Sequence, residues 1–369
     1  MTADRRTGGA ADGALSNEQP LGGAGRSATP PAPRSAVVIQ TAFLGDVVLT
    51  TPLLTALAEQ HGPVDVVVTP AAAPLVEGHP AVKRVISYDK RGRDAGVAGL
   101  RRLGAELRAQ RYTRAYLPHR SWRSAALALL ARVPDRVGFA DSPAAITYTT
   151  RVLRVPTGHE VERLLALAGR RTGTPPVSLA LTDADESAAD SWLAQRGIPP
   201  GFIAIAPGSI WGTKRWPYYP ALAAMLEGPL VLIGGGDDAG VADEVAGAAS
   251  GRAWSAAGAS LRVSAALIKR ARLLITNDSA PLHLATAVGT PLLAIFGPTV
   301  PEQGFGPRGS RSLALGHAGL ACRPCSAHGP QVCPLGHHRC MRELPVETVA
   351  EATAMVAGAE ERRAIRPRH

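Results

Sequence analysis

The chain has 369 residues, a length that favours two domains over one. Of its residues, 46% are hydrophobic and 19% are charged. No apolar run reaches the roughly 18 residues that a membrane span needs. The formal net charge of +10 suits an anionic ligand, an anionic membrane surface or simply an arginine-rich composition, whereas the 4% aromatic content and dispersed arginines disfavour nucleic acid.

The first part of the chain carries no helical or strand periodicity. Residues 1–34 are rich in glycine, alanine and proline and lack the apolar core of a signal peptide. We therefore expect a disordered N-terminal tail and a cytoplasmic protein.

Short apolar runs alternate with helical patterns from residue 36 onward, which predicts a parallel α/β sheet. Strands are expected at residues 36–40, 64–69, 84–87, 115–117 and 137–139, and helices at 47–60, 100–110, 124–132 and 159–171. Pro52 lies inside the first of these helices and implies a late start or a kink. Together these elements predict a first Rossmann-like domain over residues 35–172.

A polar, proline-edged segment at 173–200 with one helix (185–196) predicts the interdomain linker. A second α/β series follows, with strands at 202–206, 230–233, 273–276 and 291–296 and helices at 219–226, 264–271 and from 280. It predicts a second Rossmann-like domain over 201–345, with a ligand cleft between the two doubly wound halves. The remaining residues, 346–369, are expected to form a helix that packs back on the first domain, and then a loose end.

The segment after the strand at 273–276 is typical of phosphate binding. Asn277, Asp278 and Ser279 offer caps for a helix that begins near Ala280, with Pro281 in its first turn. The amino end of a helix holds free N–H groups and a partial positive charge, which together bind anions. His283 either touches the ligand or merely sits on this helix.

Gly45 and Asp46 follow the first strand, in a stretch (41–46) expected to be a tight loop. Gly45 permits close approach of a ligand to the backbone. Asp46 at a helix start facing the cleft can take a proton from an attacking hydroxyl, or it is a plain N-cap.

The loop at 207–217 gathers hydroxyls and cations. Ser209, Thr213, Lys214 and Arg215 together suit a diphosphate, the alternative being a solvated loop with two surface cations. Glycines at 234–236 with Asp237 and Asp238 after them suit a ribose contact or a plain capped turn, since the dinucleotide-binding glycine spacing is absent.

All the cysteines fall within 19 residues, spaced C-x2-C-x7-C-x6-C: Cys322, Cys325, Cys333 and Cys340. Reduced structural thiols, a structural zinc site and disulfides are the alternatives.

Taken together, residues 45–52, 206–217, 276–298 and 333–341 resemble glycosyltransferase family 9, the ADP-heptose–lipopolysaccharide heptosyltransferases. The resemblance covers about residues 36–356. It implies a GT-B fold and inverting transfer of heptose from ADP-heptose to the lipopolysaccharide inner core, with no cofactor and no metal in turnover. Two departures stand out, namely Ala280-Pro281 in place of a Gly-Leu or Gly-Met pair and the long N-terminal tail.

The resemblance also implies roles for single residues. Asp46 matches the family's catalytic base, and Lys214 matches the lysine that holds the donor diphosphate. The further donor-binding positions that it implies are Gly45, Ser209, Thr213, Asp238, Asp278, Ser279, Ala280, Leu282 and His283. Arg120 and Arg123 fall where the first domain would meet an anionic acceptor.

The implied partners are ADP-heptose and a lipid-linked lipopolysaccharide core, with peripheral contact at the inner face of the inner membrane and no nucleic acid. The runner-up is a family 9 transferase that moves another nucleotide-activated sugar to a different cell-envelope glycan. A nucleotide-sugar epimerase on this scaffold would lack an acceptor site, and a binding protein without turnover would not need a carboxylate at position 46.

Overall fold

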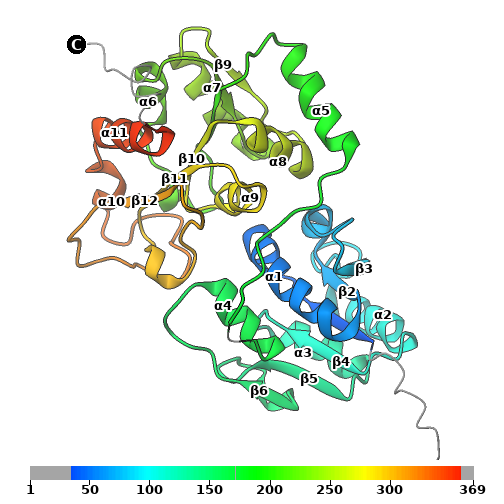
Figure 1. Cartoon of the computed structure of the whole chain (residues 1–369). Helices are drawn as coiled ribbons and strands as arrows, with labels where there is room; N and C mark the ends of the chain where they lie inside the picture. The colour runs from blue at the N-terminus through cyan, green and yellow to red at the C-terminus, as the bar shows by residue number, and fades with distance from the viewer. Residues whose placement is uncertain (1–34, 171, 359–369) are drawn as a thin grey trace, which may run out of the picture. The chain divides into compact units, whose positions relative to one another are not determined.

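The computed structural model describes residues 35–170 and 172–358 (Figure 1). The expected tail at 1–34 and the loose end after 358 lie outside these residues. All the described residues belong to one compact unit, which holds two six-stranded sheets.

Both sheets are wholly parallel and have the same strand order, counted from the first strand of each. The first sheet runs β3 (Val82–Ser87), β2 (Val64–Val68), β1 (Ala36–Ile39), β4 (Arg114–Leu117), β5 (Asp135–Phe139) and β6 (Thr150–Val152). The second runs β12 (Ser312–Gly316), β11 (Leu292–Phe296), β10 (Leu273–Asn277), β7 (Ile203–Ala206), β8 (Leu230–Leu232) and β9 (Ala253–Ser255). This is the doubly wound order, whose direction reverses between β1 and β4 and again between β7 and β10.

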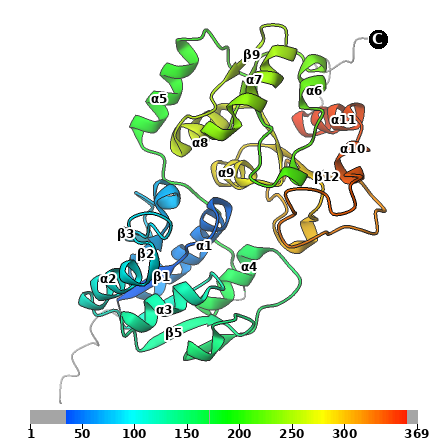
Figure 2. The ribbon, with the colours of Figure 1, turned by 180° about the vertical axis from the view of Figure 1, so that it is seen from behind.

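Helices cover both faces of each sheet (Figure 1, Figure 2). The first half holds α1 (Leu44–His61), α2 (Gly96–Ala109), α3 (Trp122–Leu130) and α4 (Glu160–Leu165). The second half and the connection to it hold α5 (Asp183–Ala194), α6 (Tyr219–Met225), α7 (Ala239–Ala248), α8 (Leu261–Arg270), α9 (Ala280–Val288), α10 (Arg339–Arg342) and α11 (Val346–Ala357).

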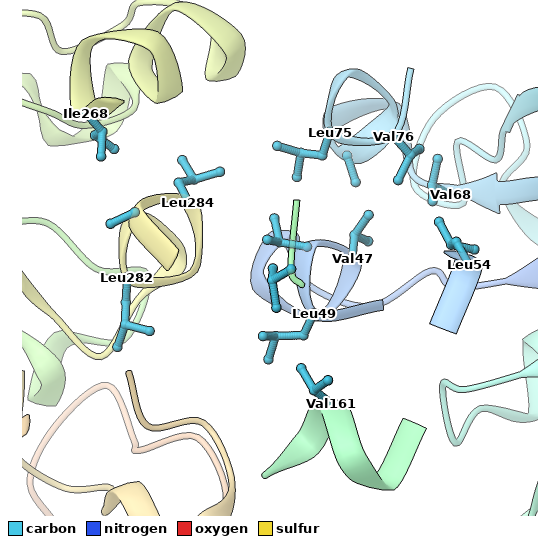
Figure 3. Packing of buried hydrophobic residues seen from close by; sticks show 14 of the residues in the cluster. Val47, Leu49, Leu54, Val68, Leu75, Val76, Val161, Ile268, Leu282 and Leu284 are labelled. Carbon is cyan, nitrogen blue, oxygen red and sulfur yellow. The ribbon is translucent and has the colours of Figure 1, made fainter. Parts of the chain in front are cut away.

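Successive side chains of a buried strand point to opposite faces of the sheet, so both faces are apolar and are covered by helices. In β1, Val38 packs in the cluster that contains α1, whereas Val37 and Ile39 pack in the cluster that contains α2 and α3. Figure 3 shows Leu49 of α1 beside Val161 of α4, both fully buried. Each sheet therefore has two apolar faces, and both are removed from water.

The start of α1 differs from the expectation. The helix begins at Leu44, so residues 44–46 form its first turn rather than part of a loop, and Pro52 is accommodated inside the helix without a late start. Phe43 is the N-cap, and the side chain of Asp46 accepts a hydrogen bond from its backbone N–H, which satisfies one free donor at the helix start.

The expected packing of the C-terminal helix is wrong. Helix α11 lies against α6 and the strands β10–β12 of the second sheet, not against the first domain (Figure 1, Figure 2). Its buried residues Val349 and Val356 join the cluster around Trp216 and Tyr219. An apolar face of the second sheet was available, and α11 covers it.

The structure contains five helices and strands that the sequence patterns did not indicate, namely β6, α7, β9, β12 and the short helix α10. The three strands lie at sheet edges and are only partly buried, and α7 is built largely from alanine and glycine. In the described part of the chain, no helix combines the length and the apolar character needed to span a membrane.

Candidate active site

The segments that follow β1, β7 and β10, three of the four strands at the reversal points, line one cavity of about 700 Å³. Ligands of doubly wound folds bind at such points. The amino end of α1 follows β1, the 207–217 loop follows β7, and the amino end of α9 follows β10. The sequence-predicted residues that line the cavity are Gly45, Asp46, Ser209, Lys214, Asp238, Asp278, Ser279, Ala280 and His283.

Asp46 lies in the first turn of α1 and faces the cavity. Its Oδ2 atom accepts a hydrogen bond of 3.1 Å from the backbone N–H of Phe43. Burial raises the pKa of Asp46 to about 6, helped by the negative charge of Glu160, while the Phe43 N–H and the cations Lys214 and Arg154 oppose the rise. The carboxylate is thus ionised at neutral pH and basic enough to take a proton.

Gly45 gives α1 room to approach α9. A Cβ atom at this position would lie 2.5 Å from Cδ2 of His283. His283 is buried, its pKa is lowered by that burial to about 4, and its Nδ1 atom has no hydrogen-bond partner among the described residues. It therefore offers a neutral imidazole at the cavity wall, between the two helix ends.

Lys214 is placed by a buried ion pair. Its Nζ lies 2.5 Å from Oδ2 of Asp278, and the Thr299 hydroxyl donates to the same oxygen at 2.6 Å. Lys214 and Asp278 are nearly buried, so neither side chain is a solvated surface charge. The pair joins the loop after β7 to the loop after β10 and directs an ammonium group into the cavity.

Asn277 holds these two loops together from beneath. Its amide Nδ2 donates to the carbonyl of Pro207 at 2.7 Å, and its Oδ1 accepts from the Trp216 N–H at 3.2 Å and the Tyr219 hydroxyl at 3.1 Å. Asn277 is the last residue of β10 and does not cap α9, whose N-cap is Ser279.

The amino end of α9 opens on the cavity through Ser279 and Ala280. Pro281 occupies an early position of the helix, as expected. First-turn N–H groups have no partner within their own helix, so this end is suited to bind an oxyanion.

Asp238 closes the glycine turn after β8. Its Oδ2 accepts from the Gly235 N–H at 2.9 Å, and its carboxylate lies so close to Gly208 that a Cβ at that position would collide with it. Asp238 also lines the cavity, beside Gly208 of the 207–217 loop.

Four predicted contact residues do not line the cavity. Thr213 is buried, with its hydroxyl donated to the Pro330 carbonyl, and the Leu282 side chain is fully buried in the core (Figure 3). Arg120 is paired with Asp141 at 2.9 Å, and Arg123 lies at the exposed start of α3.

Sequence reasoning missed two groups of residues. Lys90 donates to the Thr41 carbonyl at 2.6 Å, and nearby Arg123 and Arg91, after the larger effect of burial, help to lower its pKa. Phe43, Trp211 and His328 gather their rings at the cavity wall. Neither group has a spacing signal, because its members come from separate parts of the chain.

The four cysteines are unpaired thiols in the structure. No set of three or more His, Cys, Asp or Glu side chains within residues 35–170 and 172–358 is arranged to hold a metal ion. The segment that carries the cysteines is nevertheless tied to the Lys214 loop, since His338 Nε2 lies 2.8 Å from the Thr213 carbonyl oxygen.

Comparisons with known proteins agree with this geometry. The family glycosyltransferase family 9 (heptosyltransferase) matches residues 100–332. Lipopolysaccharide heptosyltransferase 2 of Salmonella typhimurium is 28% identical over 291 residues, which cover 72% of this chain and 83% of that protein. Lipopolysaccharide heptosyltransferase 1 of Pseudomonas aeruginosa is 30% identical over 312 residues, which cover 78% of this chain and 85% of that protein.

Two solved structures share the fold. The family 9 glycosyl transferase of Veillonella parvula has a TM-score of 0.79 at 22% identity and covers 88% of this chain and 97% of its own. The ADP-heptose LPS heptosyltransferase II of E. coli has a TM-score of 0.71 at 23% identity and covers 88% of this chain and 98% of its own. The architecture is the expected GT-B fold.

Proposed function

The chain belongs to glycosyltransferase family 9 and is a glycosyltransferase, and we propose that it transfers heptose from ADP-heptose to the lipopolysaccharide inner core with inversion at the anomeric carbon. The observation that carries this proposal is one cavity that brings a carboxylate, Asp46, to face a buried ammonium, Lys214, and the open amino end of α9. The names of the heptosyltransferase relatives supply the sugar and the acceptor.

In the proposed step, Asp46 takes the proton of an acceptor hydroxyl as its oxygen attacks the anomeric carbon. The new C–O bond forms as the bond to the diphosphate breaks, and ADP leaves with the electron pair. Lys214 and the first N–H groups of α9 stabilise the charge that grows on the diphosphate, each contributing about 2–4 kcal/mol to lowering the barrier. No metal is needed for this stabilisation.

The rest of the cavity suits the nucleotide. Asp238 and the glycines at 234–236 would hold the ribose, and Ser209, Asp278 and His283 would contact the phosphates and sugar. We assign residues 201–345 to donor binding and 35–172 to the acceptor, with 173–200 as linker and 346–369 as a C-terminal helix and tail. Thr213 and Leu282 would act through packing, because neither lines the cavity.

We place the acceptor on the first half, where Lys90, Arg91 and Arg123 form a basic group near the loop that leads to Asp46. The lipid anchor of such an acceptor would bring a cytoplasmic enzyme of net charge +10 to the inner face of the inner membrane. We therefore expect the protein to co-sediment with anionic vesicles but not with neutral ones, and we expect added salt to reverse this binding.

The direct test supplies the full chain with ADP-heptose, or with other nucleotide sugars, and a heptose-deficient lipopolysaccharide core. We expect ADP release only when ADP-heptose and acceptor are present together, a product with inverted configuration by NMR, and no loss of activity in EDTA.

Asp46→Asn should lower the rate of transfer by about 10²- to 10⁴-fold, while the affinity for ADP changes only a few-fold. Release with a different nucleotide sugar would favour the runner-up, a family 9 transferase that moves another sugar to another envelope glycan.

A further inference from the structure

Three aromatic side chains meet at the wall of the cavity and have no role in the mechanism above. The rings of Trp211 and His328 are stacked, with centroids 6.1 Å apart and planes 7° from parallel. Phe43 sets its ring at a steep angle to both, with centroid distances of 6.4 Å to Trp211 and 5.7 Å to His328. Phe43 is 46% exposed, and His328 is also exposed. We call Phe43, Trp211 and His328 the aromatic wall.

The aromatic wall is held by fixed backbone. Gln331 accepts from the Gly212 N–H at 3.0 Å and donates to the Ile210 carbonyl at 2.7 Å, so the segment that carries His328 is fastened on both sides of Trp211. Gly329 has φ +79° and lies so close to Pro298 that a Cβ at this position would lie 2.8 Å from the proline ring. The stacked pair is therefore a built feature of two interlocked loops.

Two residues of the aromatic wall, Phe43 and Trp211, form backbone hydrogen bonds to residues with proposed roles in the reaction. The Phe43 N–H donates to Asp46, the proposed base, at 3.1 Å. The Trp211 carbonyl accepts from the Lys214 N–H at 3.0 Å, and Lys214 is the proposed diphosphate ligand. A sugar ring lying on the wall would thus be within reach of Asp46.

The proposed function already assigns other residues of the same cavity to the donor. The ribose lies by Asp238 and the phosphates lie by Lys214 and α9 in the proposed function. Phe43 and His328 are exposed and take no part in those donor contacts, so their rings are open to a second substrate.

The chemistry of the wall matches a sugar face. An aromatic ring carries negative charge on its face, which attracts the weakly positive C–H groups on one side of a pyranose. Partial desolvation of the ring at the cavity wall and the positive charge of Lys214 lower the pKa of His328, so its neutral imidazole can also exchange a hydrogen bond with a hydroxyl. Clustered exposed aromatic rings at a cavity are typical of a binding surface.

We propose that Phe43, Trp211 and His328 form the subsite for the acceptor sugar ring whose hydroxyl attacks the donor. This inference rests on the proposed function, since it takes Asp46 as the base. It makes Trp211 and His328 specificity-determining residues for the acceptor, although they lie in the half assigned to donor binding, so the acceptor would contact both halves at this point.

The test compares Trp211→Ala, Trp211→Phe and His328→Ala with a control, Val332→Ala. Val332 lies in the same segment as His328, is 78% exposed and does not line the cavity. We expect Trp211→Ala to raise the KM for the acceptor about 3- to 10-fold while the KM for ADP-heptose changes less than twofold. Trp211→Phe should recover most of the loss, because it retains an aromatic face, and Val332→Ala should match the parent chain. A raised KM for ADP-heptose with an unchanged KM for the acceptor would overturn the assignment.

A binding measurement separates this inference from the proposed function. Saturation-transfer NMR with a delipidated, heptose-deficient core oligosaccharide detects contact without turnover. If the parent chain binds the oligosaccharide, Trp211→Ala does not, and no heptose is transferred, the proposed function fails while the subsite stands. If both chains bind it equally, the subsite is refuted even where transfer occurs.

Discussion

The buried position of Asp46 favours its proposed role as a base but lowers the stability of the fold. Burial raises its pKa from 3.8 to about 6, so ionising it in the folded chain costs free energy that the unfolded chain does not spend. The same rise makes the carboxylate a stronger base at neutral pH. One side chain therefore links the rate of transfer to the free energy of unfolding.

We expect kcat/KM to fall below about pH 6, because protonated Asp46 cannot accept the acceptor's proton. A pH–rate profile measured at saturating ADP-heptose checks this. An acidic limb that persists unchanged in the residual activity of Asp46→Asn would assign the titration to another group.

We also expect Asp46→Asn to stabilise the fold at pH 8 by about 3 kcal/mol, and by little at pH 4. The folded pKa is raised, so the favourable contribution of the protonated carboxyl is present below about pH 4 and is lost as the pH rises through about 6. Asparagine keeps an oxygen for the Phe43 N–H. Urea denaturation at both pH values measures the difference, with Asp183→Asn in the exposed first turn of α5 as the control.

Lys214→Ala should weaken ADP binding and also lower the free energy of unfolding by about 3–5 kcal/mol, because it leaves the carboxylate of Asp278 buried with only the Thr299 hydroxyl as partner. The double variant Lys214→Ala/Asp278→Asn should recover stability but not ADP affinity. Calorimetry and denaturation measure the two effects separately. Unchanged ADP affinity in the single variant would remove Lys214 from the diphosphate site.

At the scale of elements, the close approach of α1 to α9 depends on the lack of a side chain at Gly45. Gly45→Ala would place a methyl group 2.5 Å from His283 Cδ2, and we expect a loss of about 1–3 kcal/mol from the strain. Gly45→Ala/His283→Ala should recover stability, because the obstructing ring is gone. Activity should stay low in the double variant, since His283 lines the cavity. If the two losses simply add, the helices do not meet at this pair.

Local sequence patterns predicted the central elements well and the edges poorly. The strand–helix–strand unit of β10, α9 and β11 has a strong apolar run, a cap and a proline at the expected place, and α9 begins at Ala280 as predicted. By contrast, the pattern predicts a loop at Gly45, whereas α1 begins one residue earlier, at Leu44, with Phe43 as its N-cap. Edge strands such as β12 bury little, so their pattern is weak.

The residues of the site also differ in how well the sequence predicts them. Asp46, Lys214, Asp278 and His283 could be named because each stands beside a strand end in a readable motif. Their partners could not, because the Lys214–Asp278 pair joins positions 64 residues apart and Phe43 meets His328 from the far part of the sequence. Local periodicity carries no information on such contacts.

At the scale of the whole molecule, Arg262 joins parts that are distant in sequence. This residue of α8 donates to the carbonyls of Pro74 and Glu77 in the first half, and to Ala180 and Asp185 around α5. Arg252 is a matched guanidinium whose carbonyl partners, Ala223, Leu226 and Gly228, all lie in the second half.

Arg262→Ala should therefore separate the unfolding of the two halves. We expect a calorimetric transition that broadens or splits in two, because each half keeps its own sheet while losing shared contacts. Arg252→Ala should lower the midpoint but keep a transition no broader than that of the parent chain. Equal broadening in both variants would show that the hydrogen bonds of Arg262 do not couple the unfolding of the two halves.

The hydrogen bonds of Asn277 have a further consequence for how the protein can be followed in solution. One amide group binds the Pro207 carbonyl, the backbone N–H of Trp216 and the Tyr219 hydroxyl, which fastens the loop after β7 to the end of β10, so we expect the loops after β7 and β10 to open together. The Trp216 amide proton is then a natural reporter of site opening in deuterium exchange. A nucleotide that touches only one loop would still slow exchange on the other, and mass spectrometry of the two peptides would show them protected as one cooperative unit.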